Sequence, residues 1–294
     1  MARVEPQLAS GTSQHYDVRR GAAAFAPIIG GFGALCVPTI ILIYTVPGAQ
    51  MGPSAPSMGL AAGLLVVAML GSLTGSIGLA SLSGHNEATV NLPAAAAFLA
   101  VPVVVSIVAI LGAFDLLAAD FLPHATLLLA LLAVTTGSSG AFGVILNASV
   151  LPVPTSGEVV CDVKRGGRKR WWGAALAGKV KGWWGIAVTS IRSPKARGDV
   201  ARRSWRVALA GIIPIAGATI ARQFGLQGDP NPATVAYVVL LVGGYALTIT
   251  GGFWGILKTM PPRGGRYKKM RTYEAYVPSL AMSAYVVALL IFLP

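Results

Sequence analysis

Apolar residues run through this chain in long unbroken stretches, which short polar segments separate. A stretch of about 18 or more apolar residues is long enough to cross a bilayer as a helix. Membrane β-barrels instead show segments of about 10 residues in which apolar and polar positions alternate. The pattern therefore predicts an all-α fold, a polytopic integral membrane helical bundle that embeds most of the 294 residues in lipid.

The apolar stretches predict seven transmembrane helices, at residues 22–46, 58–82, 92–114, 124–146, 207–221, 233–257 and 276–293. The fifth has about 15 apolar residues, fewer than the roughly 20 that a spanning helix needs, and Arg206 and Arg222 flank it. A re-entrant or interfacial helix is the alternative at this position. Without a fifth crossing one basic cluster would lie outside, so we expect the segment to cross.

Basic residues are distributed very unevenly. The chain has no lysine or arginine between Gly21 and Val163, and then has 13 between Lys164 and Arg206. Cytoplasmic loops of membrane proteins are enriched in Lys and Arg, so the bias predicts a plasma (inner) membrane protein with a cytoplasmic N-terminus and an outer C-terminus. Topology, rather than nucleic acid, then explains the net charge of +13.

Spans and charge together predict four regions. A cytoplasmic tail (1–21) precedes a four-helix transmembrane segment (22–147). A basic cytoplasmic loop (148–206) follows, and a three-helix transmembrane segment (207–294) completes the chain.

The basic loop contains a segment, residues 171–191, whose apolar residues share one broad face of a helix. Paired tryptophans in it are typical of a membrane interface, so we expect this helix to lie on the inner leaflet. The expected partners are anionic lipid headgroups and a membrane or cytoplasmic protein. Nucleic acid is not expected, because the tryptophans would face lipid instead of stacking on bases. The predicted docking residues are Lys164, Arg165, Arg168, Lys169, Arg170, Trp171, Trp172, Lys179, Lys181, Trp183 and Trp184.

Polar residues near the predicted spans form three candidate groups. The first is a polar pathway of small hydroxyl side chains on spans two, four and six: Ser72, Ser76, Ser138, Ser139, Thr248 and Thr250. The second is a polar cluster at the inner end of span two: His85, Asn86 and Glu87. The third consists of Asp115, Asp120 and His124, which are expected in a solvated outer loop.

Glycines and other small residues recur four positions apart within the spans, as at Gly71 and Gly75 or at Gly251 and Gly255. Small residues at this spacing let the backbones of membrane helices approach closely. The pattern predicts a tightly packed bundle. Helix faces that slide or kink, as a transporter needs, are the alternative interpretation.

A short segment of span four, residues 136–143, resembles the Gly-x-Ser-Gly segment of rhomboid proteases, and also a Gly-Ser-Ser-Gly-Ala segment of proton-translocating transhydrogenases. The rhomboid resemblance implies that Ser139 needs a histidine base from a later helix. The last histidine of the chain is His124, and no nucleotide-binding domain accompanies the segment. We therefore predict no catalytic residue, no cofactor and no metal site.

Proton- or sodium-coupled carriers usually place a carboxylate near the centre of a span, and the predicted spans have none there. The function predicted is a non-enzymatic membrane subunit of a transport or secretion assembly. One alternative is a self-sufficient channel or permease for an uncharged or anionic solute. Others are an enzyme that acts on lipid through His85 and Glu87, and a conjugation-type pore whose basic loop contacts DNA.

Overall fold

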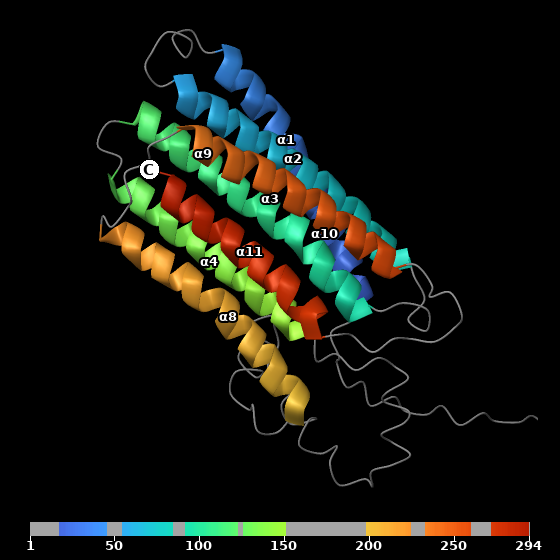
Figure 1. Cartoon of the computed structure of the whole chain (residues 1–294). Helices are drawn as coiled ribbons and strands as arrows, with labels where there is room; N and C mark the ends of the chain where they lie inside the picture. Colours follow the sequence, from blue (N-terminus) through green and yellow to red (C-terminus); the bar gives the residue numbers. More distant parts are fainter. Residues whose placement is uncertain are drawn as a thin grey trace, which may run out of the picture.

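The computed structural model describes residues 18–45, 55–84, 92–122, 126–150, 198–224, 233–259 and 272–293, and every element in these ranges is helical. Figure 1 shows the helices side by side as one bundle, in which α9, η3 and α10 follow one another as a single rod. The elements are α1 (Val18–Thr45), α2 (Ala55–Gly84), α3 (Leu92–Phe121), α4 (Thr126–Val150), α8 (Gly198–Gln223), α9 (Ala233–Tyr237), the π-helix η3 (Val238–Val242), α10 (Gly243–Thr259) and α11 (Thr272–Phe292).

Six of these rods are long and apolar enough to cross a membrane, and a shorter apolar helix, Tyr276–Phe292, accompanies them. A helix satisfies all its backbone hydrogen bonds internally, as a segment surrounded by lipid must. The prediction of an all-α membrane bundle is therefore confirmed.

The third helix is longer than predicted. Its helical conformation continues from the predicted end at Phe114 to Phe121, so Asp115 and Asp120 lie on α3. Their predicted position in a loop is wrong, and Asp115 is buried, although Asp120 is exposed as expected. His124, the third member of this predicted group, lies outside the described residues. The helix continues because apolar residues surround Asp115 and because an arginine of another helix neutralises its charge.

The fifth helix, α8, is also longer than its apolar stretch, since it begins at Gly198 within the basic region. Its apolar part, Trp205–Gln223, has 19 residues. At about 1.5 Å per residue this part is roughly 28 Å long, close to the thickness of about 30 Å of a bilayer's hydrocarbon core. The described helix is therefore long enough to cross, as expected.

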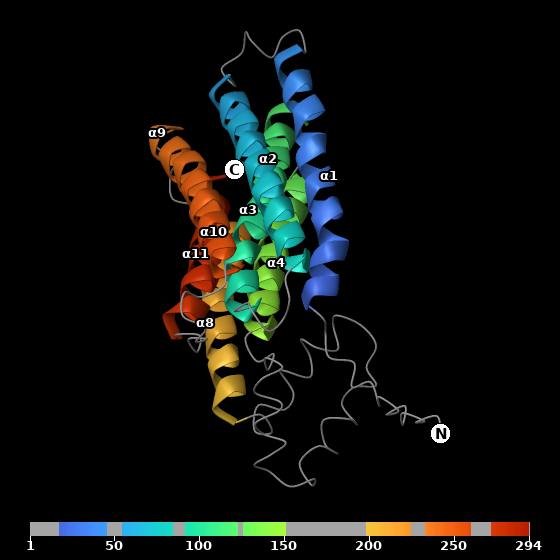
Figure 2. The same cartoon turned by 90° about the vertical axis from the view of Figure 1, so that its right-hand side faces the viewer.

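Successive rods run in opposite directions (Figures 1 and 2). The rods α1, α3, α8 and α11 end at one end of the bundle, which we call the far end. At the opposite end, which we call the loop end, α4 finishes at Val150 and α8 begins at Gly198. Both connections to residues 151–197 therefore leave from the loop end.

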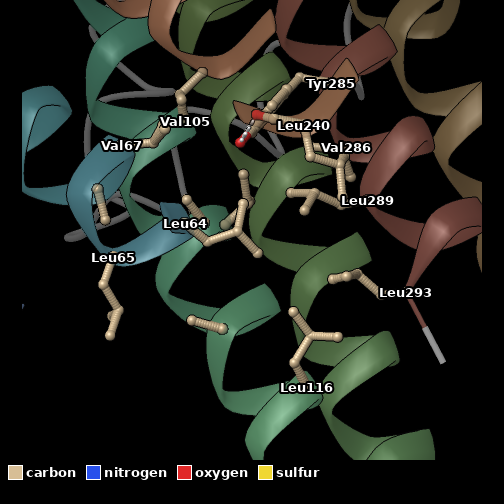
Figure 3. Packing of buried hydrophobic residues seen from close by; sticks show 14 of the residues in the cluster. Leu64, Leu65, Val67, Val105, Leu116, Leu240, Tyr285, Val286, Leu289 and Leu293 are labelled. Carbon is tan, nitrogen blue, oxygen red and sulfur yellow. Dashed lines mark hydrogen bonds between the residues drawn. The ribbon is translucent and has the colours of Figure 1, made fainter. Parts of the chain in front are cut away.

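Helix α3 is the centre of the bundle. It packs against α2, α4, α10 and α11, and it is the most deeply buried of the spans. Figure 3 shows the apolar cluster around it, which includes Leu64 of α2, Val105 of α3 and Leu289 of α11. The outer helices α1 and α8 are the least buried of the spans. Large apolar side chains are exposed on them and on the outer faces of other helices, as a surface in contact with lipid requires.

A single π-helical turn, η3, interrupts the sixth rod and was not predicted. Such a turn contains one residue more than an α-helical turn and weakens the regular hydrogen-bond ladder. The hydroxyl of Tyr285 on α11 donates a hydrogen bond to the carbonyl oxygen of Leu240 at 3.2 Å (Figure 3). The interruption is thus stabilised by a side chain from another helix.

Candidate functional site: polar contacts inside the bundle

Two of the predicted groups lie outside the described residues. One is the polar cluster His85, Asn86 and Glu87. The other is the docking set in the basic loop, namely Lys164, Arg165, Arg168, Lys169, Arg170, Trp171, Trp172, Lys179, Lys181, Trp183 and Trp184. Both remain predictions, as does the interfacial helix at residues 171–191.

The candidate pathway residues lie in several separate places. On α2, Ser72 is buried and faces α3, whereas Ser76 donates a hydrogen bond to the carbonyl oxygen of Ala26 on α1 at 2.8 Å. On α4, Ser138 is exposed and bonds to the Thr135 carbonyl of its own helix, and its neighbour Ser139 is half-buried. On α10, Thr250 is exposed and Thr248 is buried.

The two hydroxyls of Ser72 and Ser106 join α2 to α3. Ser106 Oγ lies 2.8 Å from the carbonyl oxygen of Ala68 and donates its proton there. Ser72 Oγ, 2.6 Å from Ser106 Oγ, is then the donor to Ser106. Both side chains are buried, so these hydroxyls are used for helix contact. Thr248 Oγ1 is also buried, and it has no hydrogen-bond partner within the described ranges.

An ion pair lies near the far end of the bundle. Arg222, in the last turn of α8, donates a hydrogen bond to Asp115 Oδ2 on α3. Solvent reaches only 6% of the Arg222 side chain and 2% of the Asp115 side chain. Asp115 Oδ1 is buried too, and no hydrogen bond to it occurs in the described part of the chain. The pair therefore brings together two formal charges in an almost dry site.

The pair joins two helices, α3 and α8, that otherwise have few direct contacts. Both helices pack against α4 and α11 instead. Gln223, the neighbour of Arg222, adds a hydrogen bond of 3.3 Å from Nε2 to the carbonyl oxygen of Ala130 on α4. The C-terminal end of α8 is thus fixed to two neighbouring helices.

Two further buried polar contacts hold α11 to α4 and α8. Asn147 Nδ2 on α4 donates to Ser279 Oγ on α11 at 2.8 Å. Ser283 Oγ, one turn further along α11, donates to the carbonyl oxygen of Gly211 on α8 at 2.8 Å. In lipid, such interhelical hydrogen bonds contribute about 0.6 kcal/mol each on average. They specify which helix faces meet.

The expected close approach of glycine-bearing faces is present. A methyl group added at Gly71 of α2 would lie 2.8 Å from the carbonyl oxygen of Pro102 on α3. One added at Gly251 of α10 would lie 2.9 Å from Val101 Cβ and 3.1 Å from the carbonyl oxygen of Phe98. Only glycine permits these backbone contacts, so α2 and α10 pack closely on α3.

The described ranges contain no group of three or more His, Cys, Asp or Glu side chains that could hold a metal ion. Comparison with models of protein families, with curated proteins and with solved structures gave no match.

The sequence offered only partial signals for these contacts. Arg222 and Asp115 were both visible as charges beside spans, but they lie 107 positions apart and nothing local pairs them. Ser106, Asn147 and Tyr285 were not selected at all. A buried-charge argument could have found the ion pair, since an arginine and an aspartate within apolar segments at the same membrane face are natural partners.

Proposed function

We propose that this protein is a non-enzymatic integral membrane subunit of a transport or secretion assembly. Its basic loop, residues 148–206, would dock anionic lipid headgroups and a membrane or cytoplasmic protein partner. The loop end of the bundle would face the cytoplasm of a cell with a plasma (inner) membrane, and the far end would face outside.

The observation that carries the proposal is the segregation of positive charge. Among the basic residues in the described helices, Arg206 and Lys258 lie towards the loop end, where Arg19 and Arg20 also begin α1. The 13 Lys and Arg residues between Lys164 and Arg206 attach to this same end. Each such residue near an anionic surface gains about 1 kcal/mol, so lipid contact accompanies docking of a protein.

The contacts inside the bundle agree with a scaffold more than with a permease. Ser72 and Ser76 use their hydroxyls to bind α3 and α1, and Ser138 and Thr250 lie on the outer surface of the bundle. A solute path would instead need such groups on one shared internal face. This arrangement supports a helical scaffold that binds its partners through the basic loop at the loop end.

The test asks whether the full-length protein keeps a partner when it is extracted from its own membranes. The membranes are treated with a bifunctional crosslinker and the protein is extracted with a mild detergent. The size of the extracted complex is then measured on a native gel and by mass spectrometry. We expect a larger species of fixed stoichiometry. Neutralising the first cluster of the loop, with Lys164, Arg165, Arg168, Lys169 and Arg170 all replaced by glutamine, should abolish it.

A matched control neutralises the same number of charges in the other basic connection, namely Arg263, Arg266, Lys268, Lys269 and Arg271. The complex should survive this change. A wild-type protein that runs alone after crosslinking would contradict the subunit proposal. Equal loss of the complex in both variants would also contradict it, because the loss would then follow from the reduced net charge and not from the basic loop.

A further inference from the structure

The buried residues of the sixth rod do not follow the period of an α-helix. They succeed one another at intervals of four positions: Ala236, Leu240, Gly244 and Thr248. Three regular α-helical turns cover about 11 residues, and would lead from Ala236 to Leu247. The additional residue of η3 therefore directs Thr248 into the core, and it leaves Leu247 only partly buried at the edge of the core.

This register is unfavourable at Thr248. Its Oγ1 atom is buried and has no hydrogen-bond partner in the described part of the chain. Threonine within a helix commonly bonds to the carbonyl oxygen one turn before it, and a buried hydroxyl without any partner is destabilising. A register that buries Leu247 instead would remove this hydroxyl from the core.

Tyr285 of α11 stabilises the observed register. Its hydroxyl donates to the carbonyl oxygen of Leu240 within η3 (Figure 3). The same hydroxyl lies against the bare backbone of Gly244, since a methyl group added there would be 2.6 Å from Tyr285 Oη. The tyrosine thus offsets the unsatisfied Thr248 hydroxyl and fits only where a glycine faces it.

A second glycine satisfies this requirement in the other register. Gly243 directly precedes Gly244, and apart from the neighbouring backbone of its own helix no atom lies within 4 Å of a methyl group added there. A change of one residue in register rotates a helix by about 100° and moves it by about 1.5 Å along its axis. Gly243 would then take the place of Gly244 against Tyr285, and Leu247 the place of Thr248.

The loop-end part of α10 is held in place during such a change. A methyl group added at Gly251 would lie 3.1 Å from the carbonyl oxygen of Phe98, and one added at Gly255 would lie 3.3 Å from the backbone nitrogen of Leu99. Both contacts are with the backbone of α3, which cannot move aside cheaply. The change of register is therefore confined to the part of α10 that precedes Gly251.

We propose that η3 is a register switch. Its additional residue moves from residues 238–242 into α10 and back, which exchanges Leu247 for Thr248 in the core while both ends of the rod keep their positions. Each move breaks and re-forms the hydrogen bonds of the turn. These bonds are weak already, because the N–H of Gly243 is shared between the carbonyl oxygens of Val238 and Leu240. The switch is a property of the bundle and does not depend on a bound partner.

The test follows the methyl group of Thr248 by NMR in the full-length protein in lipid nanodiscs. Threonine methyl groups are isotope-labelled in otherwise deuterated protein, and Thr248→Ser identifies the signal by its loss. Relaxation dispersion detects exchange between two states on the microsecond-to-millisecond timescale. We expect exchange at Thr248. Thr219 of α8 is the internal control and should show none, because it belongs to another rod.

Two alanine substitutions act on the two registers in opposite directions. Gly244→Ala conflicts with Tyr285 in the observed register, so it should raise the population of the other register by about tenfold. Gly243→Ala has room for its methyl group in the observed register and conflicts with Tyr285 only in the other one. It should therefore remove the exchange at Thr248 and leave the main signal unshifted.

Either of two results would overturn the switch. One is the absence of exchange at Thr248 in the unchanged protein. The other is exchange that is the same in Gly243→Ala as in the unchanged protein. If Gly244→Ala fails to accumulate, Gly243→Ala decides alone, because open space surrounds its added methyl group.

Discussion

At the scale of single residues, the bundle uses its few polar side chains to hold helices together. A buried charge without a partner is costly, so Asp115 and Arg222, which lie towards the C-terminal ends of α3 and α8, stabilise each other by cancelling charge. Ser72, Ser106, Asn147 and Ser283 extend the same principle to neutral groups. Each of these contacts joins two different helices.

The glycine contacts give the most local prediction. Gly71→Ala would place a methyl group 2.8 Å from the Pro102 carbonyl oxygen and 3.0 Å from Ser106 Cβ. Because a backbone atom cannot move aside cheaply, we expect the free energy of unfolding to fall by about 1–3 kcal/mol. Thermal unfolding of the purified protein in detergent or nanodiscs measures it.

Gly31→Ala is the matched control for this substitution. Apart from the neighbouring backbone of its own helix, no atom lies within 4 Å of a methyl group added there. Alanine favours a helix over glycine by about 1 kcal/mol, so Gly31→Ala should leave the unfolding temperature unchanged or raise it. Equal losses at the two positions would contradict close packing of α2 on α3.

At the scale of elements, the predicted positions of the helices are close to the observed ones, but some predicted helix ends differ from the observed ends. Hydropathy locates a span because lipid excludes unpaired backbone groups, which is a local property of the sequence. The extension of α3 through Asp115 depends instead on Arg222, 107 positions away. The turn η3 likewise depends on Tyr285, which belongs to another helix.

Tyr285 offers a test of this element-level support. Tyr285→Phe keeps the ring in the core and removes the hydroxyl that donates to the Leu240 carbonyl oxygen. We expect a loss of about 0.5–1.5 kcal/mol in unfolding free energy, together with faster hydrogen exchange within residues 238–242. Unchanged exchange in this segment would show that the π-turn persists without the tyrosine.

At the scale of the whole molecule, the bundle has two unlike ends. The loop end gathers the described basic residues other than Arg222 and both connections to residues 151–197, while the far end holds the buried ion pair. The fold class followed from the sequence, because long apolar stretches admit few other structures. The arrangement of polar contacts did not, because it depends on which helix faces meet in space.

The most direct test of this arrangement is whether α8 crosses the membrane. Single cysteines at Trp205 and Phe224, at the two ends of its apolar part, are placed in the protein that lacks Cys36 and Cys161. Their labelling by an impermeant maleimide is compared from each side of the membrane. We predict labelling from opposite sides, with Trp205 on the side of the basic loop, whereas labelling of both from one side would contradict a bundle of seven crossing helices.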